Sequence, residues 1–414
     1  MRQCCFGIVL LAMSLAHAQA VHAGNAPSEK PRTCSSAVEA DGYLYLAGQN
    51  ANRPDGSLPN NFNEQAIQAL ANVKAIVEAS GLTMEHVVYV QIYLEDVGNY
   101  SALSKVLKDF FPNVPPAGAV LGVSKLPRPA IQINAVAVRD LFGHKAVIPA
   151  SYKLDEPLSP GILTHDRLFV SAMRGRSLET GKITEDPAGQ TDLALDGLKA
   201  VAEAAGLSMK HFVFVNPYLT KNIPSRIMNE RYARRFEFGN TPGRATIEVT
   251  ALPQQAQIEY TAVAVRDLSL RRAIRPKNMP PSPTASPCVF AGATLYCSAK
   301  SGFIPGPHGG VFGVTTAAQL RQTMRNQLDN LEEADMDFSQ VVSTTNYLDD
   351  LSDSAAFSKT YAEYFRYALP VQTLLQQLPS ADRAPDEEGH YPDLEQVSLI
   401  AVKNFRMKDS KDCQ

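Results

Sequence analysis

The feature that most constrains this chain is an internal repeat with a period near 126 residues. Leu126-Pro127, Leu252-Pro253 and Leu378-Pro379 recur at that interval, and the segment EASGLTMEHVVYV at 78–90 returns as EAAGLSMKHFVFV at 203–215. Such a period is too long for a solenoid unit and matches a whole small domain. The 414 residues therefore predict three tandem domains. We expect them at 28–142, 151–268 and 284–404.

Each repeat shows the same order of predicted elements. In the first repeat they are a hairpin at 37–49, a helix whose buried face carries Ile67, Leu70, Val73 and Val77, a strand at 87–94, a helix around 103–110, and an alternating strand at 131–138. The apolar residues recur every three or four positions in the helices and every second position in the last strand. This order predicts an α+β unit with two helices on one face of the sheet. Links are expected at 145–153 and 276–287.

The N-terminus has the pattern of a secretory signal peptide. Arg2 precedes an apolar run at 5–13 and a small-residue stretch at 16–20. The apolar run is shorter than the ~20 residues of a membrane-spanning helix. The sequence therefore predicts a signal peptide at 1–23 and a mature protein that is secreted or periplasmic, with no attachment to the membrane.

The charge balance and the absence of common motifs exclude several classes of function. Lys and Arg total 39 against 42 Asp and Glu, which offers no general attraction to nucleic acid. The chain has no Gly-rich phosphate loop, no Gly-x-Ser-x-Gly turn and no His-Glu-x-x-His helix. No Cys-x-x-Cys or His-x3-His spacing is present either, so no metal site is expected.

Four cysteines remain once the signal peptide is removed: Cys34, Cys288, Cys297 and Cys413. Four cysteines allow three pairings, and the sequence alone does not choose among them. If 291–294 forms a tight hairpin turn, Cys288 and Cys297 face each other across the two strands. A disulfide between these two residues is one hypothesis, and buried free thiols are the alternative.

The repeated motifs resemble those of the RidA/YjgF family of imine and enamine deaminases. The resemblance rests on the Leu-Tyr-Leu-Ala-Gly-Gln strand at 44–49, the Gly-Leu pair that ends the first helix, the Tyr-Leu strand ends, and Pro242-x-Arg244-x-Thr246 before Leu252-Pro253. It implies a chorismate-mutase-like fold and homotrimers with ligand clefts between subunits. Three fused copies then imply an intramolecular pseudo-trimer that acts as a monomer.

The resemblance also implies a reaction and a set of site residues. The family hydrolyses 2-imino acids such as 2-iminobutanoate and 2-iminopropanoate to 2-oxo acids and ammonia, without a metal or an organic cofactor. Its hallmark arginine, which grips the substrate carboxylate, corresponds to Arg244, while Gly118 and Gln372 stand at that place in the other repeats. Asn229 and the backbone N–H of Thr246 match two further ligand-contacting positions. We therefore expect that one of the three clefts keeps the ligand-binding residues and that it binds a small carboxylate.

One departure from the family pattern bears on catalysis. The glutamate that the family places on its last strand is replaced by Asn134, Thr261 and Ser398 in the three repeats. Glu259 lies two residues before Thr261, about 7 Å along the same strand face. Glu259 and Thr261 are thus candidates for positioning the hydrolytic water, although a solvated strand carboxylate is the simpler interpretation of Glu259.

The sequence leaves three hypotheses for the function. The first is a weak or altered imine deaminase built around Arg244, and the second is a protein that binds small carboxylates without turnover. Ribonuclease activity, ascribed to some relatives, is the least favoured because the chain lacks basic and aromatic stripes.

Overall fold

The computed structural model describes residues 20–21, 35–277, 279–306, 310–365, 369–380 and 382–407. Almost all of the predicted signal peptide lies outside these residues, and so do Cys34 and Cys413. None of the helices in the described ranges is long and apolar enough to cross a membrane.

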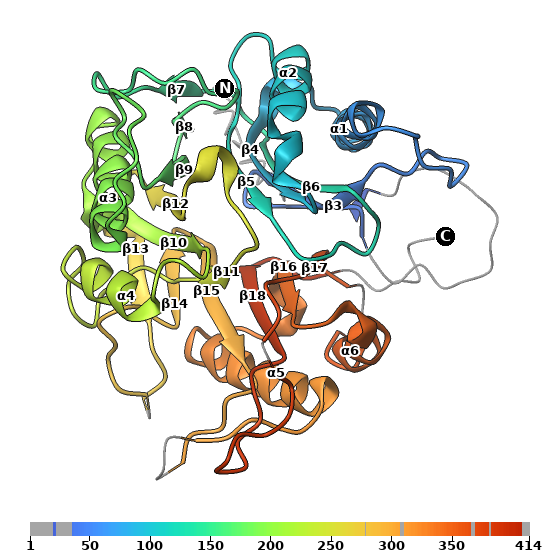
Figure 1. Ribbon diagram of the computed structural model, residues 1–414, viewed down its shortest axis with the longest axis vertical. Helices are drawn as coiled ribbons and strands as arrows, with labels where there is room; N and C mark the ends of the chain where they lie inside the picture. Colours follow the sequence, from blue (N-terminus) through green and yellow to red (C-terminus); the bar gives the residue numbers. More distant parts are fainter. Residues whose placement is uncertain are drawn as a thin grey trace, which may run out of the picture.

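Three sheets of six strands share one strand order, which confirms the predicted α+β architecture (Figure 1). The first repeat contains β1 (Ala20–Val21), β2 (Ala37–Ala40), β3 (Tyr43–Asn50), α1 (Phe62–Ala79), β4 (Val87–Leu94), α2 (Tyr100–Phe110), β5 (Ala117–Gly122) and β6 (Ile131–Val138). The second contains β7 (Lys145–Val147), β8 (Gly161–Leu163), β9 (Arg167–Arg174), α3 (Pro187–Ala204), β10 (Phe212–Leu219), α4 (Ser225–Ala233), β11 (Ile247–Glu248) and β12 (Ile258–Val265). The third contains β13 (Arg271–Ile274), β14 (Cys288–Ala291), β15 (Thr294–Ser301), α5 (Thr316–Glu333), β16 (Val341–Leu348), α6 (Ser354–Ala362), β17 (Val371–Gln376) and β18 (Glu395–Val402).

Several strands were missed by the sequence patterns. β5 pairs in parallel with β4, and β17 does the same with β16. Two short strands were missed as well: β7, at the start of the first expected link, pairs with β8, and β13, which ends just before the second expected link, pairs with β14. These segments are too short or too uniformly apolar to show an alternating pattern, so each is recognisable only by its neighbour in the sheet.

The first long helix ends at the glycine that its sequence predicts, but one residue of the predicted buried face is wrong. The side chain of Asn61 caps α1 by accepting from the backbone N–H of Glu64, and Gly81 follows the helix with a positive φ. Leu70, Val73 and Val77 are fully buried, whereas Ile67 is 43% exposed. The core-facing stripe runs instead along Ala66, Ala69, Leu70, Val73, Ile76 and Val77.

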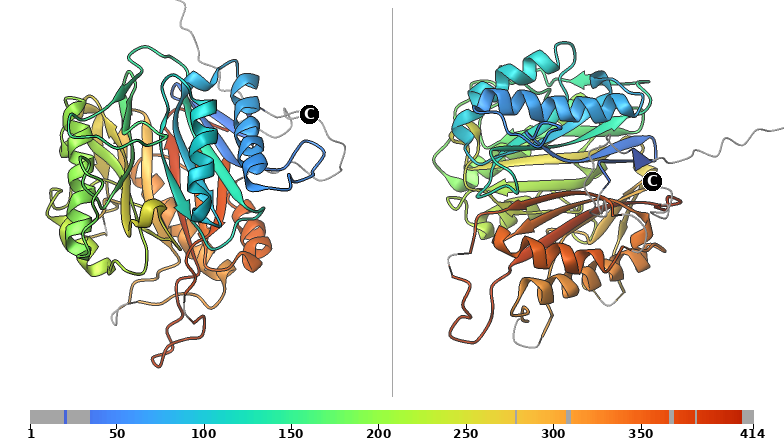
Figure 2. Two further views of the ribbon diagram at one scale, coloured as in Figure 1. Left: turned by 45° about the horizontal axis from the view of Figure 1, so that its top comes forward. Right: turned by 90° about the vertical axis from the view of Figure 1, so that its right-hand side faces the viewer.

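The three repeats pack around a common centre, with the helices outside and the sheets facing inward (Figures 1 and 2). One face of each sheet packs on its own helices, as with Ile131 and Ile133 of β6. The other face packs against the other repeats, so that Tyr45, Ile162 and Val342 share one apolar cluster. The three units therefore form one body rather than a string of separate domains.

Arg167 joins all three repeats at this centre. Its fully buried guanidinium group lies 2.6 Å from Asp41 Oδ2 of the first repeat and 2.8 Å from Thr294 Oγ1 of the third. It also stacks over the ring of Tyr43, 4.3 Å from the ring centre. A buried arginine satisfied by both neighbours ties the packing of the second repeat to the first and third.

Cys288 and Cys297 are joined by a disulfide. They are register partners across the β14–β15 hairpin, with Cα atoms 4.0 Å apart. Both residues are fully buried in the core of the third repeat.

Candidate functional site

Arg244 lies where the second sheet departs from the pattern of the other two. In the first repeat, β5 pairs with β4 over six consecutive residues. In the second repeat only Gly243 and the pair Ile247–Glu248 contact β10 in register, and the chain between them leaves the ladder. Arg244 therefore projects from a local opening at the edge of the sheet.

The opening has a cause in the sequence of β10. Pro217 stands in the middle of this strand and has no N–H with which to bond a neighbouring strand. The side chain of Asn216 takes over part of that role, since its Oδ1 accepts from the backbone N–H of Ala245 at 3.1 Å. A proline and an asparagine in β10 thus hold the arginine-bearing segment away from the sheet.

Strand registers place Gly118 and Gln372 at the position of Arg244. Gly118 pairs with Val90 and Gln372 pairs with Thr344. These partners occupy the same step of β4 and β16 as Val215 does in β10. The structural alignment therefore agrees with the sequence alignment that singled out Arg244.

Arg244 lies at the interface with the third repeat, where its backbone contacts β15. Its backbone N–H donates to Ser298 Oγ at 2.8 Å, and its carbonyl oxygen accepts from the N–H of Ala299 at 3.1 Å. We call this part of the interface the Arg244 cleft, after the ligand cleft that the sequence analysis expected; Arg244 and Asn229 belong to the second repeat, and Ser298 and Ala299 to the third. It lies between two repeats, as the sequence analysis expected of a ligand cleft.

The guanidinium group of Arg244 has no carboxylate partner in the described part of the chain. Its Nη1 donates to Asn229 Oδ1 at 2.7 Å, and its Cζ lies 5.3 Å from the centre of the Tyr232 ring. Burial lowers the pKa of Arg244, with Tyr232 and Tyr260 acting in the opposite direction. The structure therefore brings Arg244 and Asn229 together, as the sequence analysis required, and leaves the arginine without a counter-ion.

Lys300 is a partly buried residue that sequence reasoning did not single out. It pairs with Val397 on β18, the step at which Met173 pairs with Tyr260 in the second repeat. Met173 lines the cavity beside Gly118, so Lys300 holds the equivalent position in the third repeat. Burial lowers the pKa of Lys300, and no salt bridge to it is found among the described residues. The sequence signal that could have identified Lys300 is a lysine at a strand position where the second repeat has methionine.

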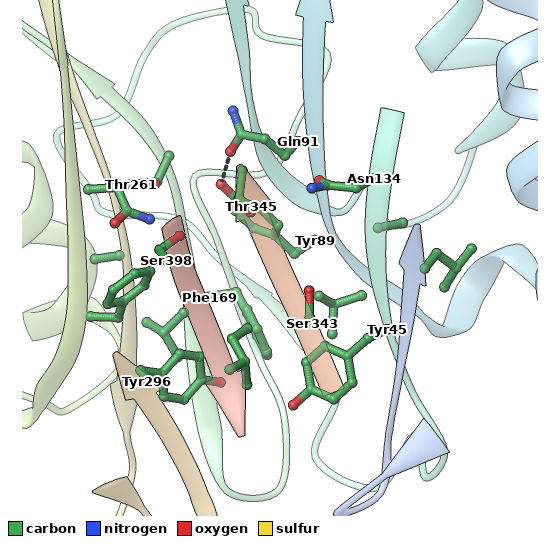
Figure 3. Close-up of a pocket in the computed structure, with 18 of the residues that line it drawn as sticks. Tyr45, Tyr89, Gln91, Asn134, Phe169, Thr261, Tyr296, Ser343, Thr345 and Ser398 are labelled. Carbon is green, nitrogen blue, oxygen red and sulfur yellow. Dashed lines mark hydrogen bonds between the residues drawn. The ribbon is translucent and has the colours of Figure 1, made fainter. Parts of the chain in front are cut away.

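Thr246 and Thr261 occupy different surroundings. Thr246 Oγ1 is buried without a hydrogen-bond partner among the residues that the structure describes. Thr261 instead lines a central cavity of about 110 Å³, together with Asn134 and Ser398 (Figure 3). The three replacements of the family glutamate thus gather at the centre of the molecule, and Arg244 is not among the residues that line this cavity.

The expectation of a solvated Glu259 is wrong. Its side chain is fully buried, and its Oε2 lies 3.2 Å from Nε of Arg174. Burial raises the pKa of Glu259 to about 7, against the opposing effect of Arg174. Arg174 in turn stacks near Tyr100 of the first repeat. Glu259 therefore belongs to the interface with the first repeat, whereas Arg244 faces the third.

Within the described ranges, no group of three or more His, Cys, Asp or Glu side chains is placed to hold a metal ion.

The fold and this cleft define a class: a protein of three like α+β units, with a half-buried arginine between two of them that has no carboxylate partner among the described residues. The family model described as Endoribonuclease L-PSP matches residues 25–139, 151–266 and 278–379. The chain therefore belongs to this family, the RidA/YjgF family that the sequence motifs indicated.

The relatives match single repeats. A RutC family protein from Aquifex aeolicus is 40% identical over 109 residues, which are 25% of this chain and 87% of that protein. The 2-iminobutanoate/2-iminopropanoate deaminase of Dermatophagoides farinae is 36% identical over 107 residues, or 25% of this chain and 84% of that protein. The mouse protein of the same name is 32% identical over 111 residues, or 26% and 82%.

Proposed function

We propose that the protein hydrolyses 2-imino acids to 2-oxo acids and ammonia in the Arg244 cleft. The observation that carries this proposal is the half-buried guanidinium of Arg244, which is oriented by Asn229 and has no carboxylate partner in the described ranges. A planar guanidinium binds a carboxylate through two parallel hydrogen bonds. The similarity to two proteins named 2-iminobutanoate/2-iminopropanoate deaminase supports the choice of substrate.

The reaction needs little beyond orientation. Water adds to C2 of the imine, and the nitrogen gains a proton to give a carbinolamine. The hydroxyl proton then passes to the nitrogen through water, the C–N bond breaks, ammonia leaves and the carbonyl forms. Arg244 holds the carboxylate so that C2 and one water molecule stay in a fixed relation, which replaces a random encounter by a positioned one.

A second candidate, the binding of a small carboxylate without turnover, is favoured by a different observation. The groups that affect the pKa of Arg244 are tyrosines, not a carboxylate that could serve as a base. Thr261, at the family's glutamate position, is a neutral residue in the central cavity. Proton transfer in the Arg244 cleft would then depend on water, and turnover would be slow or absent.

The deciding experiment generates 2-iminopropanoate in situ from alanine with an amino-acid oxidase and follows the disappearance of the imine. The purified protein should accelerate its loss above the blank, and Arg244→Ala should return the rate to the blank. Arg226→Ala is the matched control, because Arg226 is an exposed arginine of α4 that pairs with Glu230 on the surface. Equal rates for the blank, the protein and Arg244→Ala would refute deamination, and 2-oxobutanoate titration would then test binding alone.

We also propose that the protein is exported. The charged start, apolar run and small residues at 1–23 support a cleaved signal peptide and a secreted or periplasmic location. Expression in a Gram-negative host, followed by mass measurement of the periplasmic protein, should show a chain cut between residues 18 and 24. A full-length chain retained in the cytoplasm would contradict this.

A further inference from the structure

A second cleft, between the first and second repeats, is the geometric counterpart of the Arg244 cleft. The backbone N–H of Gly118 donates to Ser171 Oγ at 2.8 Å, just as Arg244 donates to Ser298. Gly118 cannot carry a side chain here, since a Cβ atom would stand 2.1 Å from the carbonyl oxygen of Val90. The family's arginine is therefore absent from this cleft, and the straight β5 strand leaves no room for it.

Two other arginines enter this cleft from the opposite side. Arg174 ends β9, and Arg176 follows it; both side chains are at least nine-tenths buried. Between them lies the carboxylate of Glu156, with Oε2 3.2 Å from Nη1 of Arg174 and Oε1 in contact with Nη2 of Arg176. The hydroxyl group of Tyr100, from the first repeat, donates to the same carboxylate. Glu156 thus has the partners that a bound carboxylate ligand would have.

The other groups around the cleft show that Glu156 is the main counter-ion. Against the opposing effect of burial, Arg174 and Tyr100 hold the pKa of Glu156 below its ordinary value. The pKa of Glu259, the other carboxylate near Arg174, is raised by burial to about 7. Arg174 also donates to Gln254 Oε1 at 3.0 Å. Loss of the Glu156 carboxylate would therefore leave two buried guanidinium groups with too little negative charge.

The position of Glu156 in the chain is also informative. It lies on the connection between β7 and β8 of the second repeat. The side chain is 9% exposed, and the cavity that remains beside it measures about 20 Å³, room for a single water. Leu154, Leu158 and Met173 form apolar walls around the charged centre. The connection thus fills a cleft that would otherwise be open.

We propose that this cleft is a second carboxylate-binding site, occupied in this chain by the tethered carboxylate of Glu156. Removal of that side chain should open the site to a short-chain monocarboxylate, whose charge would meet Arg174 and Arg176 and whose alkyl group would meet the leucine walls. The proposal does not depend on activity at Arg244.

The test uses the full chain with Arg244→Ala in every sample, so that only the second site can report. Glu156→Ala in this background should bind acetate and propionate at least about tenfold more tightly than the Arg244→Ala parent does, because paired guanidinium groups bind carboxylates through charge-assisted hydrogen bonds. Calorimetric titration and the shift of the thermal midpoint measure this gain. Glu156→Gln is the matched control, since it fills the same volume without a charge and should gain nothing.

If Glu156→Ala does not fold in plain buffer, the yield of folded protein after refolding is measured instead. Sodium acetate, but not sodium chloride at the same concentration, should then restore folded protein. Adding Arg174→Ala should abolish the acetate effect. The proposal is overturned if Glu156→Ala gains neither affinity, nor thermal stability, nor refolding yield from acetate beyond what chloride gives.

Discussion

Arg174, which is buried, and Arg244, which is half-buried, are arginines of the same repeat that should respond in opposite ways to substitution by methionine. Arg174→Met removes the cation that lies 3.2 Å from both Glu156 and Glu259. Breaking a buried ion pair from one side costs about 3–5 kcal/mol, because charge is left uncompensated. The partial protonation of Glu259 at neutral pH places the expected loss near the lower end of that range.

Arg244→Met should cost much less stability than Arg174→Met. Within the described residues, the one short hydrogen bond from its guanidinium group is the 2.7 Å contact with Asn229, worth about 1 kcal/mol. This loss is offset because the substitution relieves the burial of an unpaired charge, the same burial that lowers the pKa of Arg244. We therefore expect the free energy of unfolding of Arg244→Met to stay within about 1 kcal/mol of the parent protein.

Ligand affinity should fall more in Arg244→Met than in Arg174→Met, the reverse of the order expected for stability. Loss of a bidentate contact to a carboxylate removes about 2–3 kcal/mol, which weakens the binding of 2-oxobutanoate roughly 30- to 150-fold in Arg244→Met. Urea unfolding gives the stabilities, followed by far-UV circular dichroism because the chain has no tryptophan. If Arg244→Met lost as much stability as Arg174→Met, Arg244 would be a structural cation and the argument for a free ligand-binding arginine would fail.

Three further predictions concern other groups. Burial raises the pKa of Glu259 to about 7, so its carboxyl group holds in the folded state a proton that the unfolded chain releases near pH 4.5. The stability of the protein is therefore lost as pH rises through this window. The urea midpoint of Glu259→Gln should exceed that of the parent protein by an amount that grows between pH 5 and pH 7 and then levels off. A constant difference from pH 5 to pH 8 would contradict that pKa. Lys300→Met should raise the urea midpoint, because Met173 packs at the same position in the second repeat. The same substitution should weaken the binding of 2-oxobutanoate. A lower urea midpoint would indicate that the ammonium group of Lys300 is paired. The tryptic peptide 278–300 contains both Cys288 and Cys297 and should take up an alkylating reagent only after reduction, whereas uptake beforehand would refute the disulfide.

Local patterns predicted much of the fold because their information lies within a few residues. The position of a tight turn made a Cys288–Cys297 disulfide one of two hypotheses, beside free thiols, and the structure has the register and the bond of the first. The alternation at 131–138 predicted that every second residue of this strand shares a face, and Ile131 and Ile133 do lie together in the core of the first repeat. The failure at Ile67 is of a different kind, since the width of the buried stripe depends on how closely the sheet approaches the helix.

Contacts between repeats could not be predicted in the same way. Glu259 and Arg244 are 15 positions apart in the sequence, yet one faces the first repeat and the other the third. The cluster of Tyr100, Glu156 and Arg174 joins residues from two repeats, and no periodicity within either repeat indicates that they meet.

By itself the sequence determined the number of repeats, their α+β class, the family and the one repeat that keeps its arginine, because each of these is written in local motifs and their spacing. The tertiary structure decided which repeat faces Arg244 and that Glu156 fills the neighbouring cleft. The physical reason is that charge pairing and burial depend on distances across interfaces, and those distances exist only after the three sheets have packed together.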